Sequence, residues 1–297
     1  MGRRAVVFGA AGQLGSELVR ELGRRGYQTA AWDRHHLDIT DNRAVEKAVA
    51  ALDTGVVFNC AAYNQVDVAE QEPLAALQVN ALAVRNVALA CRQIDALLVH
   101  FSTDYVFDGA TSSPYAEDAP THPLSAYAVS KLAGELYAQA YLDRPLLVRT
   151  CGVFGPGGRH TARGNFVELM LRLAGSGRPI RVVADHVASP TYAPWLAART
   201  VELAERGHRG VFHIGGGAPI AWFDFARMIF EAAGLRPELT ATNEREYRTA
   251  ARRPKYSALS NAKMEAAGIA PMPPLRQALA DYFAQRNASG GVSGSPA

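Results

Sequence analysis

Cysteine is scarce in this sequence, and its acidic and basic residues nearly cancel. The 297 residues include three cysteines, at positions 60, 91 and 151, too far apart for a C-x-x-C motif. So few thiols, in odd number, predict a reduced protein of the cytoplasm without structural disulfides. The net charge is +3, from 31 basic and 28 acidic residues that are scattered along the chain. This balance argues against nucleic acid as a partner.

Long uncharged apolar runs are absent as well. No stretch reaches the ~18 apolar residues that a membrane-spanning helix needs, so we expect no membrane span. The start, MGRRAVVFGAAGQLG, places two arginines before an apolar run, as a signal peptide does. That run is too short and gives way to glycines and then to charged residues, which argues against a signal peptide. A hydrophobic content of 48% and a charged content of 20% are typical of a soluble globular enzyme.

The first half of the chain alternates short apolar runs with longer amphipathic segments. The apolar runs predict buried strands at 4–10, 27–33, 55–62, 96–103 and 144–153. The segments between them predict helices at 15–26, 41–52, 72–93 and 125–142. Repeated strand–helix units of this kind predict a Rossmann-like, doubly wound parallel sheet with helices on both faces.

A glycine-rich loop follows the first predicted strand directly. The spacing is Gly9-x-x-Gly12-x-x-Gly15, immediately before the first predicted helix. One glycine makes the tight turn, one lets the backbone approach a pyrophosphate, and one lets the helix pack on the strand. The phosphates then meet the N–H groups at the positive end of the helix. This position favours a dinucleotide site over a purely structural glycine turn.

The end of the second predicted strand leaves the choice of dinucleotide open. Asp33 follows Gly15 by 18 residues, where an acid can bind the adenosine ribose hydroxyls of NAD. Arg34 comes next and could instead accept the 2′-phosphate of NADP. The cofactor is therefore expected to be NADH or NADPH.

A tyrosine and a lysine lie four residues apart in the helix predicted at 125–142. Tyr127 and Lys131 share a helix face, a spacing that random placement gives in roughly one such sequence in seven. Tyrosine, with a pKa near ~10, needs a nearby cation to act as an acid at neutral pH, and lysine supplies one. Ser102 and Thr103 end the fourth predicted strand, where doubly wound folds place their ligand chemistry. These groups together suit the reduction of a ketone.

Several stretches, in matching order over residues 5–260, resemble the dTDP-4-dehydrorhamnose reductase family of the extended short-chain dehydrogenase/reductase superfamily. They include FGAAGQLG, VVFNCAAYNQVDVAEQEP, HFSTDYVFDG, YAVSKLAGE, GNFVELMLRLA, VASPTYAPWLA and ARRPKYSAL. STDYVFDG is the most specific, because epimerases and dehydratases of the superfamily usually carry a different serine-rich segment there. The resemblance implies Thr103, Tyr127 and Lys131 as catalytic residues.

The resemblance also implies binding residues. Cofactor contacts would come from Gly9, Gly12, Gln13, Leu14, Gly15, Asp33, Arg34, Asp38, Ile39, Ala61, Ala62, Tyr63, Tyr127 and Lys131. Substrate contacts would come from Thr103, Asp104, Gly152, Asn165 and Arg253, the last two near the nucleotide diphosphate.

The chain departs from the family at two positions. Gly152 stands where the family often has a tryptophan that contacts the sugar, which predicts a more open pocket floor. Val68 stands where the family often has a lysine, and the sequence offers no account of that change.

The regular strand–helix pattern loosens after residue 151, which predicts a division into two parts. Residues 1–151 would form the NAD(P)-binding Rossmann domain, with 186–216 returning to it. Residues 152–185 and 217–286 would form a smaller substrate-binding lobe, and 287–297 a disordered tail.

Other polar residues are expected to be structural. His100 and His213 lie in apolar strands and read as core histidines, and Asp67 and Glu70 read as cap or surface acids. The segment DRHHLD at 33–38 lacks the further ligands that a metal site would need.

The expected activity is the NAD(P)H-dependent reduction of a nucleotide-linked 4-keto-6-deoxy sugar, most directly dTDP-4-dehydro-L-rhamnose. The substrate itself, and a second copy of the chain in a homodimer, are the expected partners. Two alternatives remain at this point. One is a nucleotide-sugar epimerase or dehydratase that retains its cofactor. The other is a non-catalytic, cofactor-binding regulatory subunit, since a fold does not settle function.

Overall fold

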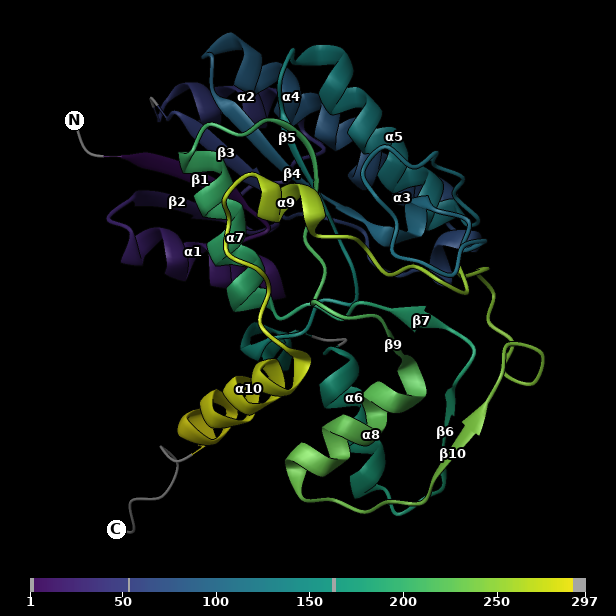
Figure 1. Cartoon of the computed structure of the whole chain (residues 1–297). Helices are drawn as coiled ribbons and strands as arrows, with labels where there is room; N and C mark the ends of the chain where they lie inside the picture. Colours follow the sequence, from purple (N-terminus) through teal and green to yellow (C-terminus); the bar gives the residue numbers. More distant parts are fainter. Residues whose placement is uncertain (1–2, 53, 162–163, 291–297) are drawn as a thin grey trace.

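A central sheet of six parallel strands organises the protein (Figure 1). The computed structural model describes residues 3–52, 54–161 and 164–290. The strand order is β2-β1-β3-β4-β5-β8, and every neighbouring pair is parallel. The bounds are β1 Arg4–Phe8, β2 Gln28–Trp32, β3 Val56–Asn59, β4 Leu97–Thr103, β5 Leu146–Thr150 and β8 Gly210–His213. The predicted doubly wound α/β fold is confirmed.

Helices cover both faces of the sheet, which is why the inner strands are buried over nearly their whole length. On one face lie α1 (Gln13–Arg24) and α7 (Ala193–Glu205), packed through Leu18, Leu22, Leu196 and Val201. On the other lie α2 (Asn42–Ala50), α4 (Ala83–Gln93) and α5 (Ala126–Tyr141), packed through Val45, Val49, Val84, Val87 and Ala138. The strand order reverses between β1 and β3, so a ligand crevice is expected at their carboxyl ends.

The helix predicted at 72–93 is divided by a π-helical turn. It consists of α3 (Pro73–Leu77), the π turn η2 (Gln78–Leu82) and α4. The turn directs the fully buried Asn80 at its neighbours. Its amide accepts from Tyr63 N (2.8 Å) and donates to Tyr63 O (2.9 Å) and Ser130 Oγ (3.0 Å). One buried side chain thus ties the loop after β3 to α5.

The same segment is long and apolar enough to cross a membrane by length and composition. Among the described residues, Pro73–Gln93 is the one helix of this kind, with a mean hydropathy of 1.5. It contains Arg85 and Arg92, which explains why no uncharged run of that length was found in the sequence. Of its most apolar window, 56% is buried inside the fold, as expected of a core helix.

A smaller group of elements packs below the sheet in Figure 1, around an aromatic cluster. The helices are α6 (Phe166–Gly175), α8 (Trp222–Ala233) and α10 (Leu275–Gly290). Here β6 (Ile180–Val183) pairs with β10 (Leu239–Thr242), and β7 (Val187–Ala188) pairs with β9 (Ile220–Ala221). We refer to this group as the C-terminal lobe. Whether it forms a separate substrate-binding domain with the predicted boundaries stays a prediction.

Some predictions for the C-terminal half need correction. The apolar pattern gave no strand at β10 and no helix at α9 (Ala262–Ala266), because both elements are short. The tail predicted to begin at 287 is wrong at its start, since α10 continues to Gly290. Residues 291–297 of that tail lie outside the described residues.

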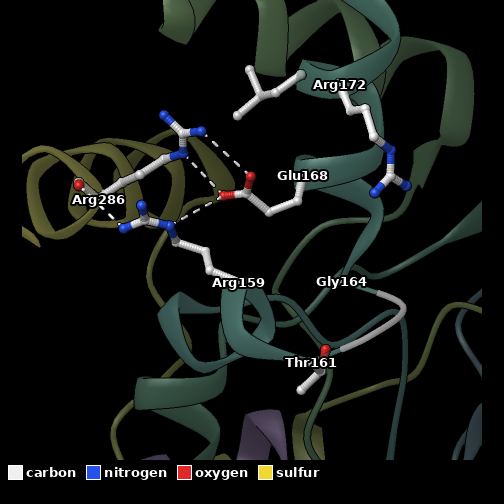
Figure 2. A pocket seen from close by; sticks show the side chains of 7 residues that line it. Arg159, Thr161, Gly164, Glu168, Arg172 and Arg286 are labelled. Carbon is white, nitrogen blue, oxygen red and sulfur yellow. Dashed lines mark hydrogen bonds and ion pairs between the residues drawn. The ribbon is translucent and has the colours of Figure 1, made fainter. Parts of the chain in front are cut away.

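The acid Glu168 joins three elements of the C-terminal lobe (Figure 2). Its carboxylate accepts from Arg286 Nε at 3.0 Å and from the Tyr282 hydroxyl, both on α10. Arg159, on the 3-10 turn η4 (Pro156–His160), lies 3.9 Å from the same oxygen. The pocket around this cluster, of about 280 Å³, contains none of the predicted catalytic residues. We interpret the cluster as a structural clamp on α10.

Helix α5 lies unusually close to the π turn, and a glycine permits it. A Cβ at Gly134 would overlap the backbone oxygen of Asn80. Because α5 carries Tyr127 and Lys131, this close approach sets the depth of both side chains.

We predict that Gly134→Ala destabilises the protein by about 1–3 kcal/mol, the usual cost of overpacking a core. Gly23→Ala in α1 is the matched control, because no atom lies within 4 Å of its Cβ position. Alanine's higher helix propensity should make that variant about 0.5–1 kcal/mol more stable. Urea denaturation of both variants measures the difference. Equal stabilities would show that α5 can move away from the turn without cost.

Candidate active site

The glycine loop is shaped by close backbone contacts. Gly9 has φ +73°, and a Cβ there would lie 2.6 Å from Ala61 N. A Cβ at Gly15 would overlap the Gly9 carbonyl. Gly12 is the N-cap of α1 and provides no side-chain cap, and the first turn of the helix contains no acid. The helix therefore begins with N–H groups that suit a pyrophosphate, and the residues present fit a dinucleotide.

Asp33 lies at the carboxyl end of β2, beside this loop. Its Oδ1 accepts from the backbone N–H groups of His35 (2.8 Å) and His36 (3.2 Å). The His36 ring, at 2.8 Å from the same oxygen, is the main reason that the pKa of Asp33 is lowered. The acid is thus held ionised where it could bind ribose, while the neighbouring Arg34 is exposed. This geometry fits NAD and leaves Arg34 able to reach a 2′-phosphate.

The remaining predicted adenine and nicotinamide contacts lie along the same edge of the sheet. Asp38 is exposed and its carboxylate accepts from Thr40 N at 2.9 Å, which fixes the turn before α2. Ile39 is buried beneath that turn. Ala61, Ala62 and Tyr63 follow β3 and are half-buried.

Lys131 is a buried cation whose Nζ donates to the carbonyl oxygen of Phe101 in β4 at 2.6 Å. The side chain is on α5, and the residue is 3% exposed. Burial lowers the pKa of Lys131 to about 8, while the neighbouring carboxylate of Glu135 acts in the opposite direction. A buried ammonium of this kind exerts a strong electric field on groups at the end of β4, because the protein interior screens charge poorly.

Tyr127, near the start of α5, and Thr103, at the end of β4, both contact Tyr105. The Tyr127 ring packs edge-to-face on Tyr105, with centroids 6.1 Å apart. Thr103 Oγ1 donates to Asp104 Oδ1 at 3.1 Å and accepts from Tyr105 N at 3.2 Å. Tyr105 therefore links the two predicted catalytic residues, a role that the sequence analysis missed.

Two acids from the segment VDVAE connect it to α5 and to the C-terminal segment. Glu70 Oε1 accepts from Ala126 N at 2.8 Å and caps α5, so its predicted structural role is confirmed. Asp67 forms a two-point ion pair with Arg253, with Nη2 and Oδ2 2.7 Å apart. Arg253 thus ties the C-terminal segment to this loop. Its predicted contact with the substrate diphosphate stays a prediction.

The ion pair between Glu135 and Arg149 is a second feature that sequence analysis missed. Arg149, on β5, donates to the Glu135 carboxylate through Nε (3.0 Å) and Nη2 (2.7 Å), and both residues are buried. Glu135 lies four residues after Lys131 on α5. The sequence does contain a signal for this pair, because Glu135 places a second charged residue at i+4 from Lys131 on an otherwise apolar helix face.

Asp104 lies deep in the site and is 2% exposed. Burial raises its pKa to about 6, against the opposing effect of hydrogen bonds with Ser257, Cys151 and Thr103. These partners come from the C-terminal segment, from the end of β5 and from β4. Asp104 therefore connects the carboxyl edge of the sheet with the C-terminal segment through its hydrogen bonds.

Asn165 contacts the glycine loop. Its Nδ2 donates to Gln13 Oε1 (2.8 Å) and Gly155 O (3.1 Å), and its Oδ1 caps α6 at Glu168 N. Gln13 Nε2 in turn donates to Val153 O at 2.7 Å. Leu14, in the first turn of α1, packs against the core cluster on that face of the sheet. The predicted contact of Asn165 with a nucleotide diphosphate has no counterpart among these bonds and stays a prediction.

Gly152 follows β5 with φ +48°, in the left-handed region that favours glycine. A Cβ there would lie 2.9 Å from Cη2 of Trp222. The expectation of an open pocket floor is therefore wrong beside Gly152, because an indole from the C-terminal lobe occupies that space.

The two strand histidines are buried and neutral, as predicted for core residues. Burial lowers the pKa of His213 to about 3, and its Nδ1 lies 3.0 Å from Tyr115 O. Burial also lowers the pKa of His100. Within the part of the chain that the structure describes, no cluster of three or more metal-binding side chains occurs.

Comparison with known proteins gives matches over nearly the whole chain. Residues 3–288 match the family described as the RmlD substrate binding domain. The spore coat polysaccharide biosynthesis protein SpsK of Bacillus subtilis is 36% identical, covering 96% of this chain and 99% of that protein. The dTDP-4-dehydrorhamnose reductase of Streptomyces griseus is 39% identical, covering 94% and 93%. A crystal structure of dTDP-4-dehydrorhamnose reductase from Bacillus anthracis in complex with NADP has a TM-score of 0.91 and 34% identity, covering 96% and 100%.

We predict that Lys131→Met stabilises the protein at pH 7 by about 1–3 kcal/mol, because it removes a buried charge and forfeits one hydrogen bond. Since the folded state holds the lysine proton less tightly than the unfolded chain, the unfolded state binds more protons between about pH 8 and pH 10.5. The advantage of the variant should therefore be full below pH 8 and vanish as the pH approaches 10.5. Chemical denaturation across this range measures it. A constant difference would contradict the assigned pKa.

Proposed function

The chain belongs to the RmlD substrate-binding-domain family, and we propose that it reduces the 4-keto group of a nucleotide-linked 6-deoxy sugar. The preferred reaction is dTDP-4-dehydro-L-rhamnose to dTDP-L-rhamnose, with NADH or NADPH as the reductant. The observation that carries the proposal is the buried Lys131 ammonium on the helix that presents Tyr127, bonded to the strand β4 that ends at Thr103. A relative of 39% identity with the same named activity supports it.

The residues of the site divide the work of a ketone reduction. A dinucleotide held by Gly9, Gly12 and Gly15 supplies the hydride when it is bound. Tyr127 donates a proton to the oxygen at C4, and the positive charge of Lys131 favours the tyrosinate that this leaves. Thr103 holds the same oxygen through its hydroxyl. Burial of all three residues excludes water, which strengthens each electrostatic interaction.

Both dinucleotides are compatible with the loop after β2. The carboxylate of Asp33 favours the free ribose of NADH, and exposed Arg34 offers a partner for the phosphate of NADPH. A relative whose crystal structure contains NADP supports use of the phosphorylated form.

Self-association is the further part of the proposal. Exposed apolar side chains lie on the helix 73–93 and on α5, which pack against each other. Leu74 is 78% exposed and Leu136 58%, and Leu82 and Val129 on the same two helices are exposed as well. An apolar surface of this kind favours a dimer.

Light scattering should give twice the mass of one chain, and Leu136→Glu should return the protein to a monomer. A single-chain mass for the unaltered protein would contradict the dimer.

We predict that Tyr127→Phe lowers kcat by about 10²–10⁴-fold, the usual contribution of general acid catalysis. Tyr137→Phe makes the same change elsewhere on α5 and should leave kcat intact. Oxidation of NADH and NADPH with the 4-keto sugar nucleotide, followed at 340 nm, measures both variants.

The same assay separates the alternatives. A retained-cofactor epimerase or dehydratase would convert sugar nucleotides without net consumption of NADH or NADPH. A regulatory subunit would bind the dinucleotide and turn over no sugar. Unchanged turnover by Tyr127→Phe would overturn the mechanism while leaving the reductase activity in place.

A further inference from the structure

Trp222 lies where the C-terminal lobe meets the ends of the central strands. It is the first residue of α8 and directly follows β9, which pairs with β7. Its backbone N–H donates to His186 O at 3.2 Å. The strand pairing and this bond fix the backbone, so the direction of the indole is set by the fold.

The indole bridges two apolar clusters. On the lobe side it packs on Phe166, at 4.7 Å between centroids, and on Phe225, at 6.1 Å. On the other side it joins the cluster that contains Cys151 and Val106, at the carboxyl edge of the sheet. Trp222 remains half-buried between these groups. An aromatic side chain in this place is a wall between the lobe and the catalytic edge.

The indole of Trp222 occupies the space that a side chain at position 152 would need. A Cβ on Gly152 would lie 2.9 Å from the indole Cη2 and 3.4 Å from Pro190 Cα. Because Thr150 pairs with Thr103 in the sheet, Gly152 lies two residues beyond that pair, about 7 Å along the chain. The absent side chain at 152 lets the indole approach the residues that follow Thr103.

We propose that Trp222 is a specificity-determining residue whose indole forms the apolar wall for the sugar ring, a role that rests on the proposed function. The catalytic edge carries polar groups, Thr103 and Asp104, that suit the reacting oxygen and the hydroxyls. A 6-deoxy sugar also has an apolar side, formed by its ring C–H groups and its methyl group, and the indole matches that side. The wall therefore favours a methyl group over a hydroxymethyl group at C5 of the sugar.

The direct test is ligand binding to Trp222→Phe, with Trp195→Phe as the matched control. Trp195 is on α7 and packs on Tyr192, within the apolar core rather than at the catalytic edge. Titration calorimetry uses dTDP-L-rhamnose, dTDP-D-glucose and dTDP. We expect Trp222→Phe to raise the Kd for dTDP-L-rhamnose by about 3–10-fold, which is typical of a lost aromatic contact. The Kd for dTDP should stay unchanged. Its preference for the 6-deoxy sugar over dTDP-D-glucose should shrink.

A double-mutant cycle with Gly152→Ala provides a second, independent test. The left-handed backbone at 152 costs the same in both backgrounds, so it cancels in the cycle. The added Cβ should weaken the binding of dTDP-L-rhamnose more in the unaltered chain than in Trp222→Phe, because the indole is its nearest neighbour. Thermal melting of each variant confirms that it is folded.

The outcomes distinguish the two hypotheses. If the unaltered chain binds no dTDP sugar, the proposed function is wrong and the role of Trp222 falls with it. If it binds dTDP-L-rhamnose and Trp222→Phe binds it equally well, only the role of Trp222 is wrong. An equal loss of affinity for dTDP and dTDP-L-rhamnose would likewise overturn that role, since the residue would then support the pocket as a whole.

Discussion

The burial of one ammonium group, that of Lys131 against the Phe101 carbonyl, is the constraint on which the rest of the structure depends. A buried cation is costly, so the surrounding elements have to hold it in place. The glycine at 134 lets α5 lie against the π turn, and Asn80 fixes that turn to the loop after β3. The Glu135–Arg149 pair then attaches the same helix to β5. These features hold the helix whose Tyr127 packs on Tyr105, two residues beyond the end of β4.

The rest of the molecule brings three separate segments to that point. The glycine loop contacts the backbone at Ala61, in the loop after β3 that Asn80 ties to α5. Asn165 bonds Gln13, so the C-terminal lobe is fixed to the loop that would carry the pyrophosphate. The ion pair of Arg253 with Asp67 joins the C-terminal segment to the loop before α3. Distant stretches of sequence are thus fixed to one another around the candidate site.

Much of this arrangement could be predicted from the sequence, for reasons that are local. The strand–helix alternation, the glycine loop and the Tyr127–Lys131 spacing depend on residues close together in the chain. The features that could not be predicted join distant segments: the Glu135–Arg149 pair, the Asn165–Gln13 bond and the indole of Trp222 beside Gly152. Gly152 is the clearest case. The sequence shows a missing side chain, and only the folded chain shows that a residue 70 positions later fills the space.

The most direct test of a reductase assembled around Lys131 and Tyr127 follows the hydride itself. The protein is incubated with dTDP-4-dehydro-L-rhamnose and a nicotinamide dinucleotide deuterated at the transferable C4 position, and the product is analysed by mass spectrometry and NMR. The account predicts dTDP-L-rhamnose with one deuterium at C4 of the sugar and an equal amount of oxidised dinucleotide. Product that carries no deuterium, or a dinucleotide that stays reduced while the sugar is converted, would contradict it.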